Sequence, residues 1–298
     1  MPSNAELHMP EILPVPIAIS HTIRGIPYHV RRWGDPDAPS IVLLHGSKDG
    51  SWTFRFLVDA LTRSWSVSAP DWRGHGRSGW TPGGYWLHDF VSDLDRLLDD
   101  LSPDGPATLV GHSLGGNVAG LYAGLRPERV KALVSLDGFG PPPRHLGVEG
   151  ADLLRMALDR GPGSPAPMTG LDEAVRRLMR ANPRLTHDRA VALATDATEM
   201  RPDGTVAWRR DPSFGESLPS LRTIEEWHDI WRRITADVLW IASTDPRPGG
   251  ITVGTETFER RRAMMPRVQV ETVPDTSHNL HQDAPDAVAA LVEAFLAP

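Results

Sequence analysis

The chain has 298 residues, of which 40% are hydrophobic and 23% charged, a composition typical of a globular protein with a sizeable core. Its formal net charge of −7 argues against a nucleic-acid partner, and the absence of cysteine excludes disulfides, thiol catalysis and thiolate metal sites. No run of about 18 apolar residues occurs, and residues 1–20 lack the pattern of a secretory leader. We therefore expect a cytoplasmic protein that does not enter the membrane.

Short apolar runs alternate with helical stretches along the chain. Residues 20–32 alternate in polarity and predict a starting hairpin. Between residues 87 and 101, leucines recur at helical spacing and predict a helix. Further strands are predicted near residues 41, 66, 107, 132, 237 and 268. Strands that alternate with helices imply a mostly parallel sheet covered by helices on both faces.

This rhythm breaks between residues 137 and 237. The run Pro141-Pro142-Pro143 indicates that the chain leaves the sheet. Helices are predicted over residues 149–160, 170–181 and 186–200, and nothing there is typical of a sheet strand. We expect residues 141–220 to form a helical cap inserted after the sixth strand, between core segments 1–140 and 221–298.

Residues 111–115 read Gly-His-Ser-Leu-Gly and form the G-x-S-x-G pattern of a nucleophile elbow. The apolar run 107–110 precedes them and a helix-like run follows. A sharp turn from strand to helix strains the backbone of Ser113, and glycine on either side removes side chains that would clash. Ser113 is the predicted nucleophile.

His278 is the predicted general base. It lies after a plausible last strand, residues 268–273, and before the predicted C-terminal helix. A loop there can reach the elbow over the edge of a parallel sheet. His281 is close by, but no third ligand with metal spacing is visible, so we expect neither a metal nor another cofactor.

Two carboxylates compete to orient the imidazole of His278. Asp245 follows the predicted strand 238–242, and Asp137 ends the strand 132–136. Both positions fall at the edge of the sheet where parallel strands have their carboxyl ends. Both also give the chain order serine, acid, histidine.

The oxyanion that forms during acyl transfer needs two backbone N–H groups. One is expected from Leu114, the residue after the nucleophile. The other is expected from the loop after the strand at residues 41–44, with Ser47 as the first choice and Lys48 as the alternative.

Together these motifs resemble the α/β-hydrolase fold superfamily, in its serine-nucleophile branch. The resemblance covers nearly the whole chain and rests on residues 43–46, 69–78, the elbow, Asp245-Pro246 and Ser277-His278. It implies an eight-stranded, mostly parallel sheet, and an acid that usually follows a later strand, which favours Asp245 over Asp137. One departure is Ala242, where the acid loop of this superfamily commonly has glycine.

The resemblance implies a serine hydrolase that cleaves a small or medium carboxylic ester. The same triad also serves C–C bond hydrolases, lactonases, thioesterases and perhydrolases, and the fold serves ligand receptors without turnover. The partner expected is a small-molecule substrate, and the oligomeric state stays open. Trp52 and Met156, the latter in the cap, are candidates to line the substrate pocket.

Overall fold

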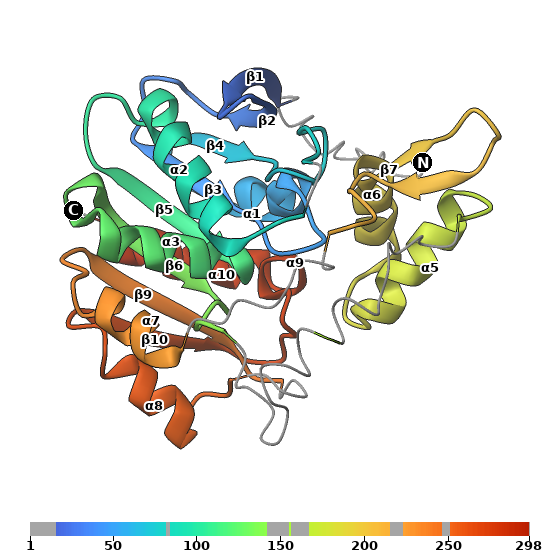
Figure 1. Cartoon of the computed structure of the whole chain (residues 1–298). Coiled ribbons are helices and arrows are strands. Elements are labelled where there is room, and N and C mark those ends of the chain that lie inside the picture. Colours follow the sequence, from blue (N-terminus) through green and yellow to red (C-terminus); the bar gives the residue numbers. More distant parts are fainter. Residues whose placement is uncertain are drawn as a thin grey trace, which may run out of the picture.

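The computed structural model describes residues 16–81, 84–141, 155, 167–214, 223–245 and 251–297. They form an eight-stranded sheet in the order β1-β2-β4-β3-β5-β6-β9-β10, which is antiparallel at β1, β2 and β4 and parallel from β4 to β10 (Figure 1). The strands are β1 (Ile17–Ile23), β2 (Ile26–Trp33), β3 (Ser40–Leu44), β4 (Ser66–Pro70), β5 (Ala107–His112), β6 (Val130–Leu136), β9 (Asp237–Ser243) and β10 (Val268–Val273). The predicted fold class, a mostly parallel eight-stranded sheet, is confirmed.

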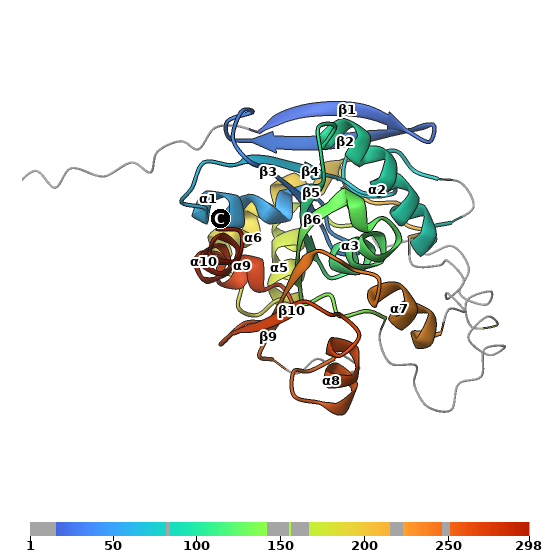
Figure 2. The ribbon, with the colours of Figure 1, turned by 90° about the vertical axis from the view of Figure 1, so that its left-hand side faces the viewer.

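Helices cover both faces of this sheet, as the view along its edge shows (Figure 2). One face packs against α2 (Leu87–Leu101), α3 (Leu114–Leu125), α7 (Ile224–Trp231) and α8 (Glu256–Arg262). The other face packs against α1 (Arg55–Ala60) and α10 (Pro285–Phe295). The short 3-10 helices are η1 (Ser51–Phe54) and η2 (Pro127–Arg129), and α9 (Leu280–Asp283) precedes α10.

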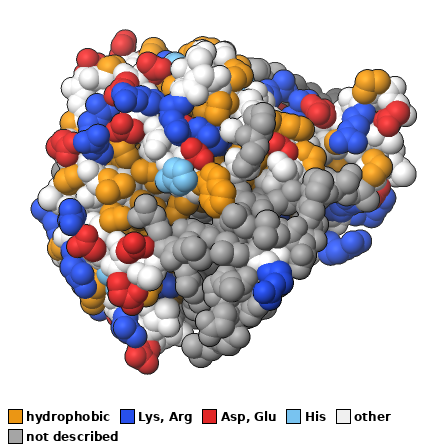
Figure 3. Space-filling model, in the orientation of Figure 1, with side chains coloured by type: hydrophobic (Ala, Val, Ile, Leu, Met, Phe, Trp, Pro, Cys, Tyr) orange, Lys and Arg blue, Asp and Glu red, His pale blue; other side chains and the backbone are white. Residues whose placement is uncertain are grey.

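Helix α2 shows how the sequence pattern produces this layering. Its buried side chains include Phe90, Leu94, Leu97, Leu98 and Leu101, which recur at helical spacing and form one apolar stripe. The stripe packs into the core against α3, while the opposite side of the helix is polar. Charged side chains of both signs lie side by side over the described part of the face in Figure 3, in keeping with 31 basic and 38 acidic residues in the whole chain.

The cap follows β6, as predicted. Its described elements are α5 (Leu171–Ala181), α6 (His187–Ala197), β7 (Thr198–Met200) and β8 (Val206–Trp208). The predicted helix 149–160 lies outside the described residues except for residue 155. The helix predicted over 186–200 was too long, because Thr198 begins a strand.

Strands β7 and β8 pair antiparallel in a small sheet separate from the main one. Helix α6 ends before Thr198, whose backbone is extended with φ of −122° and ψ of 162°. The hydroxyl of this residue donates to the carbonyl of Ala194 at 2.8 Å. Gly204, with φ of 81°, forms the turn between the two strands. The pattern of residues 186–200 missed this pair because three-residue strands are too short to show alternation.

Polar contacts hold the cap to helix α9, which follows the loop after β10. The guanidinium of Arg189 donates to the carbonyls of Gln282 at 2.7 Å and Asp283 at 3.1 Å. The amide of Asn182 donates to the carboxylate of Asp283 at 2.7 Å. The cap therefore rests on the same segment that contains His278. Within the described ranges, no helix has both the length and the apolar character needed to cross a membrane.

Candidate active site

The turn between β5 and α3 has the geometry of a nucleophile elbow. Ser113 has φ of 51° and ψ of −112°, a strained combination for a residue with a side chain. A Cβ at Gly111 would lie 2.5 Å from the backbone of Gly115, and one at Gly115 would lie 2.0 Å from the carbonyl oxygen of Leu44. Both glycines are therefore required for the helix to approach the strands this closely.

The imidazole of His278 is paired with Asp137. The distance from His278 Nδ1 to Asp137 Oδ2 is 2.8 Å, and the two side chains are 24% and 3% exposed. Asp137 directly follows β6 and has φ of 53°, and its N–H donates to the carbonyl of Ile241 at 2.9 Å. A carboxylate at Nδ1 keeps the proton on that nitrogen and leaves Nε2 as the basic one.

Ser243, the last residue of β9, holds the carboxylate of Asp137 from the other side. Its N–H lies 3.3 Å from Oδ1 and its hydroxyl 3.2 Å from Oδ2. Gly138 packs against the elbow, because a Cβ there would lie 2.7 Å from the carbonyl oxygen of Ser113. The carboxylate is therefore fixed in position relative to both the elbow and His278.

The preference for Asp245 as the partner of His278 was wrong. Asp245 instead forms an ion pair with Arg184 at 2.8 Å, and its side chain is 40% exposed. The strand β9 ends at Ser243, so Asp245 lies further along a loop that turns toward β10 and the cap. Its N–H donates to the carbonyl of Thr276 at 3.3 Å, and Arg184 also donates to the backbone carbonyl of Asp275, so this corner joins the cap to the core.

The loop after β3 carries the predicted oxyanion donors. The N–H of Lys48 donates to His75 Nε2 at 3.1 Å, so Lys48 is excluded as the alternative donor. Lys48 has φ of 63°, which turns the loop sharply beside Ser47. Ser47 and Leu114 remain the proposed pair of donors.

Two buried histidines hold this loop in shape, and both are neutral. His45 Nδ1–H donates to the carbonyl of Gly46 at 2.7 Å while its Nε2 accepts from the N–H of Trp72 at 2.9 Å. Likewise, His75 Nδ1–H donates to the carbonyl of Arg73 at 3.0 Å. Burial lowers the pKa of His45 to about 4 and of His75 to about 3. The role of these two histidines is therefore to hold the loop in place.

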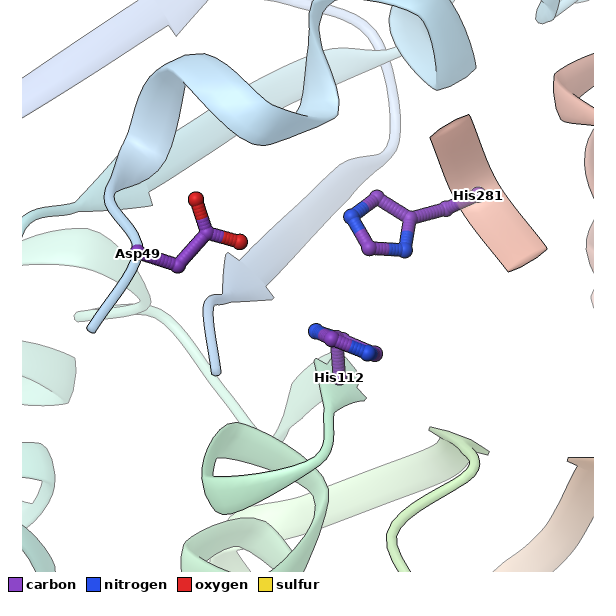
Figure 4. Close-up of side chains that lie close together, drawn as sticks. All are labelled: Asp49, His112 and His281. Carbon is purple, nitrogen blue, oxygen red and sulfur yellow. The ribbon is translucent and has the colours of Figure 1, made fainter. Parts of the chain in front are cut away.

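A second group of titratable side chains lies beside the elbow and was missed from the sequence. Asp49, His112 and His281 point toward a common space (Figure 4), with donor atoms all within 4.8 Å of one another. The ring of His112 lies 4.6 Å from that of His278 and 4.4 Å from that of His281. These residues are far apart in the sequence, so no spacing motif could have revealed them.

The two candidates for substrate contact have different outcomes. Trp52 is 5% exposed and packs in the cap cluster with Met168 and Val175. It joins the cap to the core, and that its ring lines the substrate pocket stays a prediction. Met156 lies outside the described residues.

Comparison with known proteins places this site in a family. The chain belongs to the alpha/beta hydrolase family, whose family model matches residues 41–291. It is 26% identical to a "Serine hydrolase-like protein" of Danio rerio, over 89% of this chain and 84% of the relative. It is 29% identical to "Lipase LipV" of Mycobacterium tuberculosis, over 92% of this chain and 99% of the relative.

Solved structures agree on the fold. The "Thioesterase Domain From Curacin Biosynthetic Pathway" superposes with a TM-score of 0.81 at 24% identity, covering 94% of this chain and 99% of that domain. At this identity the likeness concerns the fold alone. The family, the elbow and the histidine–carboxylate pair together define a hydrolase of the serine type.

Proposed function

We propose that the protein is a serine hydrolase that cleaves small or medium carboxylic esters through an acyl-enzyme intermediate. The observation that carries the proposal is the pairing of His278 with the buried carboxylate of Asp137 at the same sheet edge as the strained Ser113. Two relatives are named a serine hydrolase-like protein and a lipase, which supports ester chemistry.

In the first half-reaction, His278 Nε2 accepts the proton of the Ser113 hydroxyl as Oγ attacks the ester carbonyl. The N–H groups of Leu114 and Ser47 stabilise the oxyanion of the tetrahedral intermediate. When the intermediate collapses, the bond from carbon to the alcohol oxygen breaks. His278 then donates its proton to the leaving alcohol, and the acyl group stays on Ser113.

In the second half-reaction, water replaces the alcohol. The oxygen of the water attacks the acyl-enzyme while His278 takes a proton from that water. His278 then returns the proton to the oxygen of Ser113 as the carboxylic acid leaves. Asp137 stays ionised throughout, because its role is to hold the Nδ1–H tautomer and stabilise the imidazolium. Ser243 orients Asp137.

The cap contributes the roof of the substrate site in this proposal. The described part of the cap, residues 167–214, follows β6 in the chain and contacts the His278 segment through Arg189 and Asn182. Strand β6 pairs with the elbow strand β5. A roof of this kind excludes water and selects the acyl group by size. Acyl-chain selectivity is therefore assigned to the cap, and reactivity to the sheet edge.

The experiment that tests the proposal is labelling with a fluorophosphonate, followed by a panel of esters, lactones and thioesters of varied chain length. Ser113→Ala should abolish labelling and lower ester hydrolysis by a factor on the order of 10³–10⁶ while the protein stays folded. Half-buried Ser92 lies in helix α2 away from the elbow and donates to the carbonyl of His88, so Ser92→Ala provides the matched control. Wild-type turnover in Ser113→Ala would refute the role of Ser113 as nucleophile. Tight ligand binding without turnover in the native protein would refute the proposal that it is an enzyme.

A further inference from the structure

We propose that Asp49, His112 and His281 bind one divalent transition-metal ion of the Zn²⁺ type, and that this ion inhibits the hydrolase. The three residues come from the loop after β3, the last position of β5 and helix α9. Their donor atoms lie within 4.8 Å of one another around a common space (Figure 4).

The donor set fits the chemistry of such an ion. Two imidazoles and a carboxylate are typical zinc ligands, with bonds of about 2.0–2.2 Å. In tetrahedral geometry such bonds place neighbouring donors roughly 3.4 Å apart, so the side chains need to converge by about an ångström. His112 and His281 are buried and Asp49 is half-buried.

The imidazole of His112 is held as metal-binding histidines usually are. Its Nε2 lies 2.9 Å from the carbonyl oxygen of His278, and a carbonyl only accepts, so Nε2 carries the proton. In the neutral ring the lone pair is then on Nδ1. Gly46 faces this nitrogen without a side chain, where a Cβ would lie only 2.8 Å away.

His281 supplies the second, independent indication. It is fully buried, and its Nε2 lies 2.7 Å from the hydroxyl oxygen of Thr53, which also accepts from Gln282. Its Nδ1 has no hydrogen-bond partner among the described residues. In the neutral ring with the proton on Nε2, the lone pair of Nδ1 is available to an ion.

Inhibition follows from the position of the cluster, and this part rests on the proposed function. His112 precedes the nucleophile Ser113 and holds the carbonyl of His278, while Asp49 is in the loop of Ser47. Convergence on an ion would shift the elbow and the oxyanion loop. A misplacement of about 1 Å at a catalytic site can cost about 10²-fold in rate.

The test is calorimetric titration of tag-free, EDTA-treated protein with ZnCl₂. We expect one ion per chain in the wild type, and loss of that binding in both Asp49→Asn and His281→Gln. The matched control is His187→Gln, because His187 is exposed and outside the cluster, and it should bind as the wild type does. MgCl₂ should not bind, because Mg²⁺ prefers oxygen ligands.

Absence of zinc binding, or equal binding in the wild type and both variants, would overturn the site. Anomalous scattering from a zinc-soaked crystal gives a direct position that does not depend on how the variants fold. Zinc should also lower kcat at least tenfold in the wild type and in His187→Gln, and less than twofold in the two cluster variants. Zinc bound at the cluster without loss of kcat would overturn the inhibition, whereas zinc binding to a protein that hydrolyses no ester would refute only the proposed function.

Discussion

Two carboxylates at the ends of adjacent strands have opposite surroundings. Asp137 is 3% exposed, directly follows β6, and contacts His278 and the N–H and hydroxyl of Ser243. Asp245 lies on a loop beyond β9, is 40% exposed, and contacts the half-exposed Arg184. In this chain the partner of His278 is the carboxylate that directly follows its strand and accepts hydrogen bonds from Ser243. The carboxylate after the later strand is not its partner.

The two surroundings also have different energetic weight. A buried carboxylate with several donors is fixed in one geometry, and removing it leaves the imidazolium without a counter-charge. An exposed ion pair contributes about 0–1 kcal/mol because water and salt screen it. The contrast between Asp137 and Asp245 therefore predicts a large difference between the matching variants.

Among the variants that compare the two carboxylates, the largest effect is expected from Asp137→Asn. It should lower kcat by about 10²–10⁴ because the amide does not hold the Nδ1–H tautomer of His278. Asp245→Asn is the matched variant and should change kcat by no more than about fivefold, the size of an exposed ion pair. Steady-state kinetics on one ester measures kcat for both variants. A larger loss in Asp245→Asn than in Asp137→Asn would mean that Asp245 is the acid of the triad.

A smaller effect is expected from Ser243→Ala. Loss of one hydrogen bond to Asp137, worth about 0.5–1.5 kcal/mol, should lower kcat by roughly two- to tenfold and leave KM unchanged. Ser243→Thr keeps the hydroxyl and should restore most of the rate. A change in KM alone would mean that Ser243 contacts substrate and does not position Asp137.

Away from the site, Glu293 is another carboxylate held by several donors, and its effect is expected on stability. Although burial opposes ionisation, hydrogen bonds from Thr62, Trp65 and Arg63 lower its pKa to about 2. Glu293→Gln should therefore lower the free energy of unfolding near neutral pH by about 1–3 kcal/mol. Urea unfolding of both proteins measures this difference.

The pH dependence of that difference has a defined sign. Because the folded pKa is below the unfolded value of about 4.3, the stabilisation is complete above that pH and is lost as pH falls toward about 2. The wild type and Glu293→Gln should therefore converge in stability in acid. A difference that is constant from pH 7 to pH 3 would show that the carboxylate charge is not the cause.

The sequence predicted the parts of the molecule that depend on local pattern. The elbow at residues 111–115 follows from glycines that only a close strand–helix turn requires, and the sheet follows from regular alternation of strands and helices. The position of His278 in the loop after the last strand was predicted in the same way. The short strands β7 and β8 were missed because three residues are too few to show an alternating pattern.

The parts that were wrong or missed depend on side chains brought together by the fold. Asp137 and Asp245 have the same position in the pattern, and only the donors of Ser243 and Arg184 distinguish them. Lys48 has a suitable position in the sequence for an oxyanion donor, but its N–H donates to His75, which comes from another loop. The Asp49–His112–His281 cluster joins three elements and has no spacing in the chain. Contacts of this kind are tertiary, so composition and periodicity carry no signal for them.

The central claim is that Asp137 holds the Nδ1 proton of His278, and proton NMR tests it most directly. A histidine proton shared with a buried carboxylate resonates far downfield because the hydrogen bond is short and charge-assisted. We predict that this resonance is present in the wild type and in Asp245→Asn and is lost in Asp137→Asn. A downfield proton that persists in Asp137→Asn and disappears in Asp245→Asn would contradict the account.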